Sequence, residues 1–342
     1  MKIQKIEAIP FEAGPLSQLF VQIHTDEGLV GLGETWYGLP TNPIKSAIED
    51  TLLPILLNED SSRIEYLWNR MYRHAYRYGT EGVLLCAISG IDLALWDLMG
   101  QRVQRPVIQL IGGIVREGIR AYASFPPYHE EKILLREVER ALQLGFAGIK
   151  LHEVDLALIT KAAKAVPEGY PLMLDVNGLW NAVETEEKAR TLEKLNIYWL
   201  EEPLFPMQDH EAMARVRRRI NLRFASGENE FTLMGFDRLL KSGAIDFVQP
   251  EITKIGGLTT ARKISVLADL HNIPVCPHSF RIGPAAYANM HWALSQQNMD
   301  WMEIPLLPEG RSFPSKPPLL KLRNGQVILP EGPGFGFPKQ RE

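Results

Sequence analysis

The first third of the chain changes from a two-residue repeat of hydrophobic positions to a helical one. Apolar and polar residues alternate over residues 1–7, and the apolar run 19–25 is followed by a turn at 26–28 and a returning run at 29–34. This pattern predicts strands, the last two joined by a tight turn. From about 43 to 100 the repeat is helical, so we expect an α+β unit with strands first and helices after.

Beyond Gly112-Gly113 the pattern becomes an alternation of strands and helices. Eight short apolar runs follow, at 120–124, 147–150, 171–175, 197–201, 223–228, 245–251, 274–278 and 300–303. Eight strands separated by helices predict a closed parallel barrel of the α/β class. A doubly wound sheet would also alternate, but no Gly-x-Gly-x-x-Gly motif follows the first of these runs.

The last segment, from about 308, is rich in proline and glycine and contains a strand-like run at 325–330. We expect it to return and pack on the N-terminal unit. The predicted organisation is an α+β capping domain over 1–115 and a TIM-like (β/α)7β barrel over 116–307. A C-terminal segment over 308–342 would then complete the capping domain.

An ionisable residue ends or directly follows seven of the predicted strands. These residues are spaced 23 to 27 positions apart, which is one strand–helix unit each time. They are Lys150, Asp175, Glu201, Glu228, Glu251, His278 and Glu303. Because all strands of a parallel barrel open onto the same C-terminal mouth, we expect these side chains to converge there.

Helix N-capping is the ordinary alternative for an acidic residue in such a position. It does not explain Lys150 and His278, whose cationic forms are unfavourable near a helix N-terminus. It also does not explain carboxylates at three consecutive strands, because like charges crowded together repel one another. The pattern therefore predicts a bound cation, and all-oxygen ligation favours Mg²⁺, or alternatively Mn²⁺, over zinc.

Candidate bases flank the predicted metal site on two sides. Lys150 or His152 would lie on one side and His278 on the other, with Glu251 placed to orient the imidazole of His278 and raise its basicity. A metal between two bases suits the removal of a proton α to a carboxylate, because the metal stabilises the resulting enediolate.

The motifs around these residues resemble those of the mandelate racemase branch of the enolase superfamily, within the mandelate racemase/muconate lactonizing enzyme family. The resemblance covers nearly the whole chain. Its motifs are the stretch 87–97 ahead of Gly112-Gly113, Asp175-Val176-Asn177, Trp199-Leu200-Glu201-Glu202-Pro203, Gly227-Glu228-Asn229, Pro250-Glu251-Ile252-Thr253-Lys254-Ile255-Gly256-Gly257 and Pro277-His278-Ser279.

The resemblance implies a role for each matched position. It implies three Mg²⁺ ligands, Asp175, Glu201 and Glu228. Glu202 and Glu230 would be neighbours that do not ligate. His278 would be a general base or acid paired with Glu251, where the family usually has aspartate, and Glu303 would hydrogen-bond the substrate carboxylate.

The chain departs from the family pattern after the second barrel strand. The family commonly has Lys-x-Lys there, whereas this chain has Lys150-Leu151-His152. Lys150 keeps the implied role of binding the substrate carboxylate, and His152 replaces the usual base. A racemase needs acid–base groups on both faces, but a dehydratase needs only one base and an acid on the leaving hydroxyl. The departure favours dehydration, a β-elimination of water from an acid sugar, over a racemase, epimerase or lactonising cycloisomerase.

Substrate choice in this family rests on loops of the capping domain. The resemblance implies that these are Leu16–Phe20 and Thr35–Tyr37, and it places Asn177 near the substrate. Trp36 is interpreted either as a substrate contact or as part of the core.

Charge and hydropathy narrow the classes of partner. The net charge of −4 gives no general attraction to nucleic acid or to an anionic membrane. The basic run 215–219 is interpreted as a solvated helix face. The apolar stretch 83–99 contains Asp92 and Asp97, which argues against a membrane span.

The two cysteines, Cys86 and Cys276, form neither a metal-binding spacing nor a disulfide framework, so we expect a cytoplasmic protein. Its predicted partner is a small-molecule carboxylate. A homo-oligomer is expected because members of the family commonly form one. Two other classes remain open at this point, a Schiff-base aldolase using Lys150 or Lys254 and a barrel kept as a binding protein.

Overall fold

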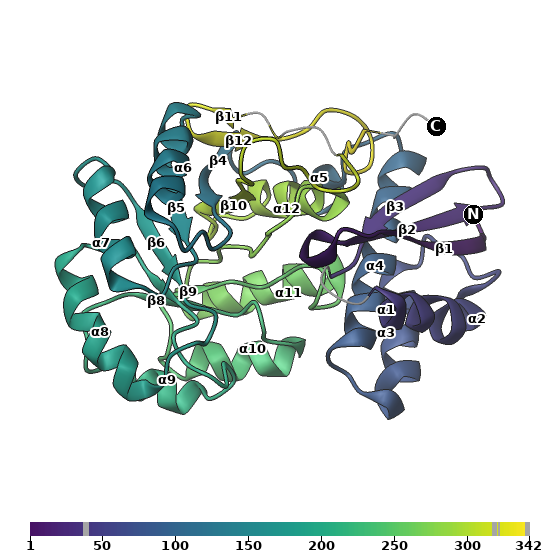
Figure 1. Ribbon diagram of the computed structural model, residues 1–342. Coiled ribbons are helices and arrows are strands. Elements are labelled where there is room, and N and C mark those ends of the chain that lie inside the picture. Colours follow the sequence, from purple (N-terminus) through teal and green to yellow (C-terminus); the bar gives the residue numbers. More distant parts are fainter. Residues whose placement is uncertain (37–40, 317–319, 321, 339–342) are drawn as a thin grey trace.

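The computed structural model describes residues 1–36, 41–316, 320 and 322–338 (Figure 1). Its N-terminal part contains a three-stranded antiparallel sheet in the order β1 (Ile3–Phe11), β2 (Gln18–Thr25) and β3 (Val30–Glu34). The helices that follow are α1 (Asn42–Ser46), a π-helical segment (Ala47–Leu52), α2 (Leu53–Leu56), α3 (Ile64–Ala75), α4 (Val83–Arg102) and α5 (Val107–Leu110). Short 3-10 turns lie at Gly14–Leu16 and Tyr76–Tyr78.

Helix α4 is the central helix of the capping domain. It is long and apolar enough to cross a membrane by composition alone, but most of it is buried inside the protein. It packs on β3, where a Cβ atom at Gly31 or Gly33 would lie within 2.2 Å of a carbonyl oxygen of α4. The two glycines therefore allow the helix to approach the sheet closely.

The two carboxylates of α4 that interrupt its apolar sequence join it to other parts of the fold. Asp92 accepts hydrogen bonds from the backbone N–H and the hydroxyl of Thr259 in the barrel domain. Asp97 accepts one from Leu32 in β3 and one from Phe335 in the C-terminal segment. Gly257 makes room for Asp92, since a Cβ there would lie 2.3 Å from its carboxylate.

The barrel has the predicted (β/α)7β order (Figure 1). Its strands are β4 (Gly118–Ser124), β5 (Gly148–Leu151), β6 (Leu172–Asp175), β7 (Leu200–Glu201), β8 (Phe224–Ser226), β9 (Phe247–Val248) and β10 (Trp301–Pro305). Its helices are α6 (Glu131–Gln143), α7 (Leu156–Ala165), α8 (Ala182–Lys194), α9 (His210–Arg217), α10 (Thr232–Lys241), α11 (Gly257–Leu270) and α12 (Pro284–Leu294). Strands β4 to β9 pair in parallel, and β10 pairs in parallel with β4.

The predicted strand at 274–278 takes part only through single bridges. Val275 pairs with Val248 on one side and with Met299 on the other, and His278 pairs with Glu251. These bridges close the barrel between β9 and β10. Strands β8 and β9 end earlier than predicted, and Glu228 and Glu251 lie beyond their last residues.

A layer of large side chains fills the barrel below its mouth. The cluster consists of Tyr122, Met173, Trp199, Ala225, Phe247, Cys276 and Trp301, nearly all fully buried. Each lies on or directly before a barrel strand, so the layer is the inward-facing set expected of a closed barrel. Cys276 therefore packs in the interior, where burial raises the pKa of its thiol.

The C-terminal segment contacts both domains. Strand β12 (Gln326–Ile328) forms a hairpin with β11 (Leu322–Arg323) and pairs antiparallel with β4, a pairing that the sequence did not indicate. Farther on, the ring of Phe337 lies against Phe20 of the capping sheet.

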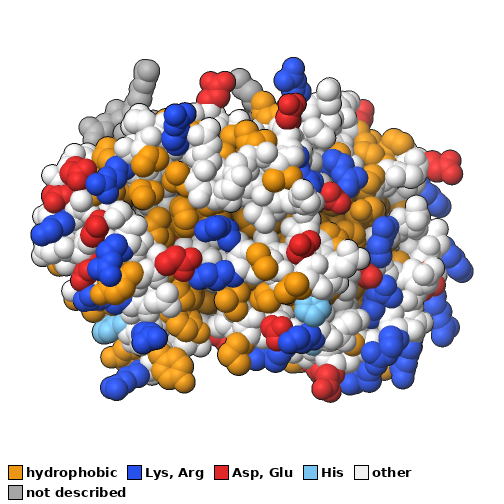
Figure 2. Space-filling model, turned by 180° about the vertical axis from the view of Figure 1, so that it is seen from behind, with side chains coloured by type: hydrophobic (Ala, Val, Ile, Leu, Met, Phe, Trp, Pro, Cys, Tyr) orange, Lys and Arg blue, Asp and Glu red, His pale blue; other side chains and the backbone are white. Residues whose placement is uncertain are grey.

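Charged side chains of both signs are intermingled over the rear face of the molecule (Figure 2). In the basic run 215–219 at the end of α9, Arg217 pairs with Asp246 and Arg219 pairs with Glu186. These arginines are partly exposed, in agreement with a solvated helix face.

His291 of α12 provides a measurable test of how the C-terminal segment is attached. Its Nδ1 accepts from the N–H of Ile108, and its Nε2 donates to the carbonyl of Phe335. Burial lowers the pKa of His291 to about 4, although the hydrogen bond to Phe335 acts in the opposite direction. As the pH falls from the ordinary value of 6.5 towards 4, the unfolded chain binds a proton that the folded protein does not.

We therefore predict that the free energy of unfolding falls over this pH interval and that His291→Gln, which keeps a donor and an acceptor without titrating, reduces the fall. The measurement is the melting temperature at about pH 7 and about pH 5 for both proteins. Equal pH dependence of the two would contradict the prediction.

Candidate active site

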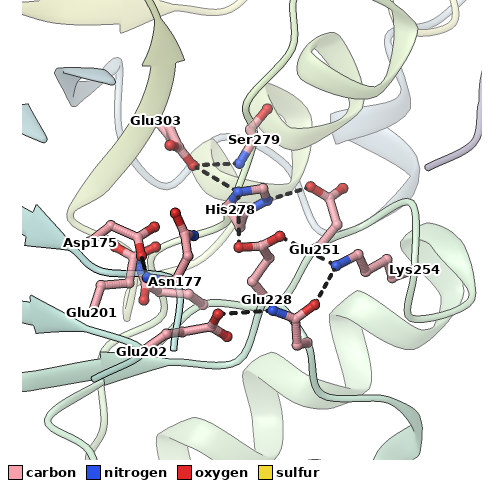
Figure 3. Close-up of polar contacts among 12 residues, drawn as sticks. Asp175, Asn177, Glu201, Glu202, Glu228, Glu251, Lys254, His278, Ser279 and Glu303 are labelled. Atoms are coloured by element: carbon pink, nitrogen blue, oxygen red, sulfur yellow. Dashed lines mark hydrogen bonds and ion pairs between the residues drawn. The ribbon is translucent and has the colours of Figure 1, made fainter. Parts of the chain in front are cut away.

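Three carboxylates from consecutive strands meet at the C-terminal mouth of the barrel (Figure 3). Asp175 ends β6, Glu201 ends β7, and Glu228 lies two residues after β8. One oxygen of each lies within 4.8 Å of the others, and all three residues are buried. We call Asp175, Glu201 and Glu228 the acidic triad.

Electrostatic repulsion within the triad affects the pKa values of its carboxyl groups. Burial alone would raise the pKa of Asp175, but Lys150 and His152 hold it well below its usual value. Burial and the charge of Asp175 raise the pKa of Glu201 well above its usual value. The triad is therefore not readily ionised at all three positions, and a divalent cation between its oxygens would remove this conflict.

The donor set fits a hard cation. Carboxylate oxygens are the ligands that Mg²⁺ and Mn²⁺ prefer, and the three converge without a cysteine or histidine among them. Neighbouring donors already orient Glu201, since Gln249 and Trp199 both donate to its Oε2, at 2.7 and 3.0 Å. The geometry therefore supports a metal site held by the triad.

Lys150 of β5 lies on the barrel side of the triad and is completely buried. Its Nζ is 2.7 Å from Glu201, 2.9 Å from Glu303 and 3.3 Å from Asp175. Burial alone would lower the pKa of Lys150, but Glu201 and Glu303 together raise it well above its usual value. A lysine held as a cation suits binding of a carboxylate, and it argues against a Schiff-base nucleophile at this position.

His278 and Glu251 form a buried dyad on the other side of the triad (Figure 3). The Nδ1 of His278 lies 2.7 Å from Glu251, while its Nε2 faces Glu228 at 3.5 Å. Burial would lower the pKa of His278, but the surrounding carboxylates raise it to about 9. The dyad therefore presents a protonated Nε2 to the triad.

Glu251 is itself held in place by several donors. The N–H and the hydroxyl of Thr253 donate to its Oε1, and Arg281 lies 3.4 Å from its Oε2. Burial opposes its ionisation, but Arg281 and His278 lower the pKa of Glu251 to about 2. Glu251 thus makes the contact with the imidazole that is expected of the usual aspartate, with Arg281 as an additional partner.

His152 lies across the triad from His278. Its Nδ1 hydrogen-bonds the carbonyl of Phe125, and its Nε2 is 3.2 Å from Asp175. A carbonyl can only accept, so Nδ1 carries a proton, and Nε2 is the ring atom that faces Asp175 and can exchange a proton there. The two histidines therefore direct their Nε2 atoms at different members of the triad.

A cavity of about 250 Å³ opens above the triad. Its polar lining consists of His152, Asn177, Glu228 and His278. Asn177 also donates its backbone N–H to Asp175, which ties the predicted substrate contact to the metal site. Glu303 lies deeper, where its carboxylate accepts from the N–H of Ser279 and pairs with Lys150.

Trp36 is partly buried and does not belong to the lining of this cavity. Its ring lies under the ammonium of Lys254, at 3.6 Å, and beside Arg281 and His278. Trp36 thus supports the charged side chains behind the dyad. Its predicted loop partner Tyr37 lies outside the described residues.

The neighbours of the ligands are separate from the triad. Glu202 accepts from the side chain of Asn229, which in turn accepts from Lys254. Burial and the charge of Glu228 raise the pKa of Glu202 to about 8. Glu230 points elsewhere and pairs with His210 at 2.8 Å.

Several residues of the site were not singled out from the sequence. They are Phe125, Gln249, Phe280 and Arg281. All four lie within three residues of a predicted site residue or strand end, which is the only signal that could have indicated them.

Comparison with known proteins agrees with this geometry. The model for the mandelate racemase/muconate lactonizing enzyme N-terminal domain matches residues 14–112, and the enolase C-terminal domain-like model matches residues 134–342. The arabinonate dehydratase of Saccharolobus solfataricus is 32% identical over 94% of this chain and 88% of that protein.

Two solved structures are also similar. The 3,6-anhydro-D-galactonate cycloisomerase of Zobellia galactanivorans has a TM-score of 0.90 and 34% identity, covering 98% of this chain and 96% of that one. A racemase of Streptomyces coelicolor with bound magnesium has a TM-score of 0.86 and 28% identity, with the same coverage. The chain belongs to the mandelate racemase/muconate lactonizing enzyme family of the enolase superfamily.

Proposed function

We propose that this protein is a Mg²⁺-dependent acid-sugar dehydratase, which removes the α-proton of a hydroxy-carboxylate and eliminates the β-hydroxyl as water. The observation that carries the proposal is the pair of imidazoles, each with its Nε2 beside a different carboxylate of the acidic triad. The dehydratase relative and the magnesium-containing racemase structure support the reaction class and the metal.

Binding of the substrate carboxylate is assigned to the acidic triad with its cation and to Lys150, which together form the charged floor of the site. Asp175, Glu201 and Glu228 would hold the cation, which would supply positive charge to offset the negative charge developing on this carboxylate. Lys150 adds a second positive charge from the barrel side, and Glu303 holds Lys150 in position through their 2.9 Å contact. Because both groups are buried, their effect on the developing charge is little screened by water.

Proton removal is assigned to His152. Its Nδ1–H is held by the Phe125 carbonyl, so the lone pair of Nε2 is directed at the triad, where the α-carbon would lie. The C–H bond breaks, its proton moves to Nε2, and its electron pair enters the substrate carboxylate.

Departure of the hydroxyl is assigned to His278. Glu251 holds its Nδ1, which leaves Nε2–H to donate a proton to the β-hydroxyl as the C–O bond breaks. Water leaves, and the remaining enol gains a proton at the β-carbon and loses its hydroxyl proton to give a 2-keto-3-deoxy acid. The net change is the loss of one water molecule, with no oxidant or reductant.

A cycloisomerase is the second candidate. The same pair of histidines can remove an α-proton and protonate a ring-ether oxygen instead of a hydroxyl, and the cycloisomerase of Zobellia galactanivorans shares the fold at 34% identity. The products differ, since a cycloisomerase retains the mass of its substrate whereas a dehydratase loses water.

We predict that Asp175→Asn weakens binding of Mn²⁺, used as a spectroscopic substitute for Mg²⁺, by more than about 100-fold, because loss of a ligand costs at least as much as loss of an outer partner. Electron paramagnetic resonance of free Mn²⁺ measures this without relying on activity. Glu230→Gln is the matched control, since Glu230 pairs with His210 away from the triad. Equal affinities in both variants would refute the assignment of the ligands.

We predict that His152→Asn lowers the rate of α-proton exchange in D₂O by about 100-fold or more. In contrast, His278→Asn should keep this exchange and lower the rate of dehydration by about 100-fold or more. Mass spectrometry of the acid and its product after incubation in D₂O separates the two effects. The opposite pattern, with exchange lost only in His278→Asn, would exchange the assigned roles. Circular dichroism of both variants serves as the control for folding.

A further inference from the structure

The cavity above the acidic triad has two chemically different parts. Its polar groups belong to the reaction centre: two histidines, the ligand Glu228, and Asn177 two residues after the ligand Asp175. The remaining lining residues are apolar: Pro15, Leu16, Phe125, Pro126, Pro127 and Phe280.

The apolar lining comes from three separate segments. Pro15 and Leu16 belong to the 3-10 turn between β1 and β2 of the capping domain, and the Phe125–Pro127 segment follows β4. Phe280 follows His278, and its ring lies edge-on to His152 at 5.9 Å. Three segments far apart in the sequence thus place apolar side chains over the same end of the substrate site.

No lysine or arginine occurs among the described residues that line this cavity. Arg281, although adjacent to Phe280, donates to the carbonyl of Thr35 and lies against Glu251. Lys150 is held by the carboxylates of the floor.

From the separation of the cavity into a polar and an apolar part, we infer that the substrate is a monocarboxylic acid whose end remote from the reacting carbons is uncharged and apolar. A deoxy sugar acid ending in a methyl group is an example. A dicarboxylic sugar acid is disfavoured by the same lining, because none of the described lining residues offers a lysine or arginine to pair with its second carboxylate. The inference rests on the proposed function and specifies the substrate class of that site.

The cost of placing each end group in an apolar pocket gives the expected order of preference among the acids. One methylene more or less in an apolar pocket changes the specificity of an enzyme by about 10- to 200-fold, and a pocket of this kind rejects an added hydroxyl by about 100-fold at most. A buried, unpaired carboxylate costs considerably more. The deoxy acid should therefore react best, the parent hydroxy acid less well and the dicarboxylic acid least.

Matched trios of acids test this order without a change of stereochemistry. Mannonate, 6-deoxymannonate and mannarate form one trio, and galactonate, 6-deoxygalactonate and galactarate form another, each in the D and L series where these differ. Both kcat/KM and the Kd for the Mg²⁺-loaded protein are measured for each acid. We expect both kcat/KM and the binding affinity of the 6-deoxy acid to be about 10-fold higher than those of its parent acid. They should be at least about 100-fold higher than those of the dicarboxylic acid.

A dicarboxylic acid that binds or reacts as well as its 6-deoxy counterpart would overturn the inference. The binding order decides the matter even if no acid is turned over, and in that case only the proposed reaction fails. Absence of binding by all of the acids would overturn both.

Leu16 offers an independent test, because it is partly exposed and does not touch the triad. Leu16→Arg should lower the Kd of the dicarboxylic acid relative to the Kd of the 6-deoxy acid by about 10-fold or more, since it supplies the missing cation. Leu16→Gln, similar in length but uncharged, should not. An equal shift in both variants, or none in Leu16→Arg at unchanged melting temperature, would count against an apolar, uncharged end.

Discussion

Buried carboxylates repel one another, and this repulsion governs the arrangement of the mouth of the barrel. Asp175, Glu201 and Glu228 lie within 4.8 Å of one another, and Glu303 lies close by on the far side of Lys150. Each is tied to a cation or to donors such as Lys150, the N–H of Ser279 or the amide of Gln249. A divalent cation would compensate the remaining negative charge. A group of carboxylates that destabilises the protein when no cation is bound is therefore suited to bind one.

The same balance extends outward from the triad through His278 to the capping domain. His278 is held by Glu251, Glu251 is held by Arg281, and Arg281 donates to the carbonyl of Thr35 beyond β3. Trp36 packs against the cations of this chain of contacts. The capping domain therefore contributes to the charge balance of the dyad as well as to the walls of the cavity.

The predictable part of the structure is the part that repeats. Regular spacing of residues such as Lys150 and Asp175 reflects one strand–helix unit, so the sequence alone indicated the barrel and the residues at its mouth. Contacts between distant segments leave no such period. Arg281 beside Glu251, the Phe125 carbonyl that fixes the tautomer of His152, and the pairing of β12 with β4 all depend on tertiary packing, which spacing does not encode.

The hydrogen bond from Phe335 to Asp97 has a consequence for the order in which the chain folds. Asp97 lies on the central helix of the capping domain, which is synthesised before the barrel domain, yet its partner is made 238 residues later. Phe335 also accepts from His291, so one residue bonds to both domains. During synthesis the carboxylate of Asp97 therefore lacks this partner until the barrel domain has also been made, and only then can Phe335 join the two domains.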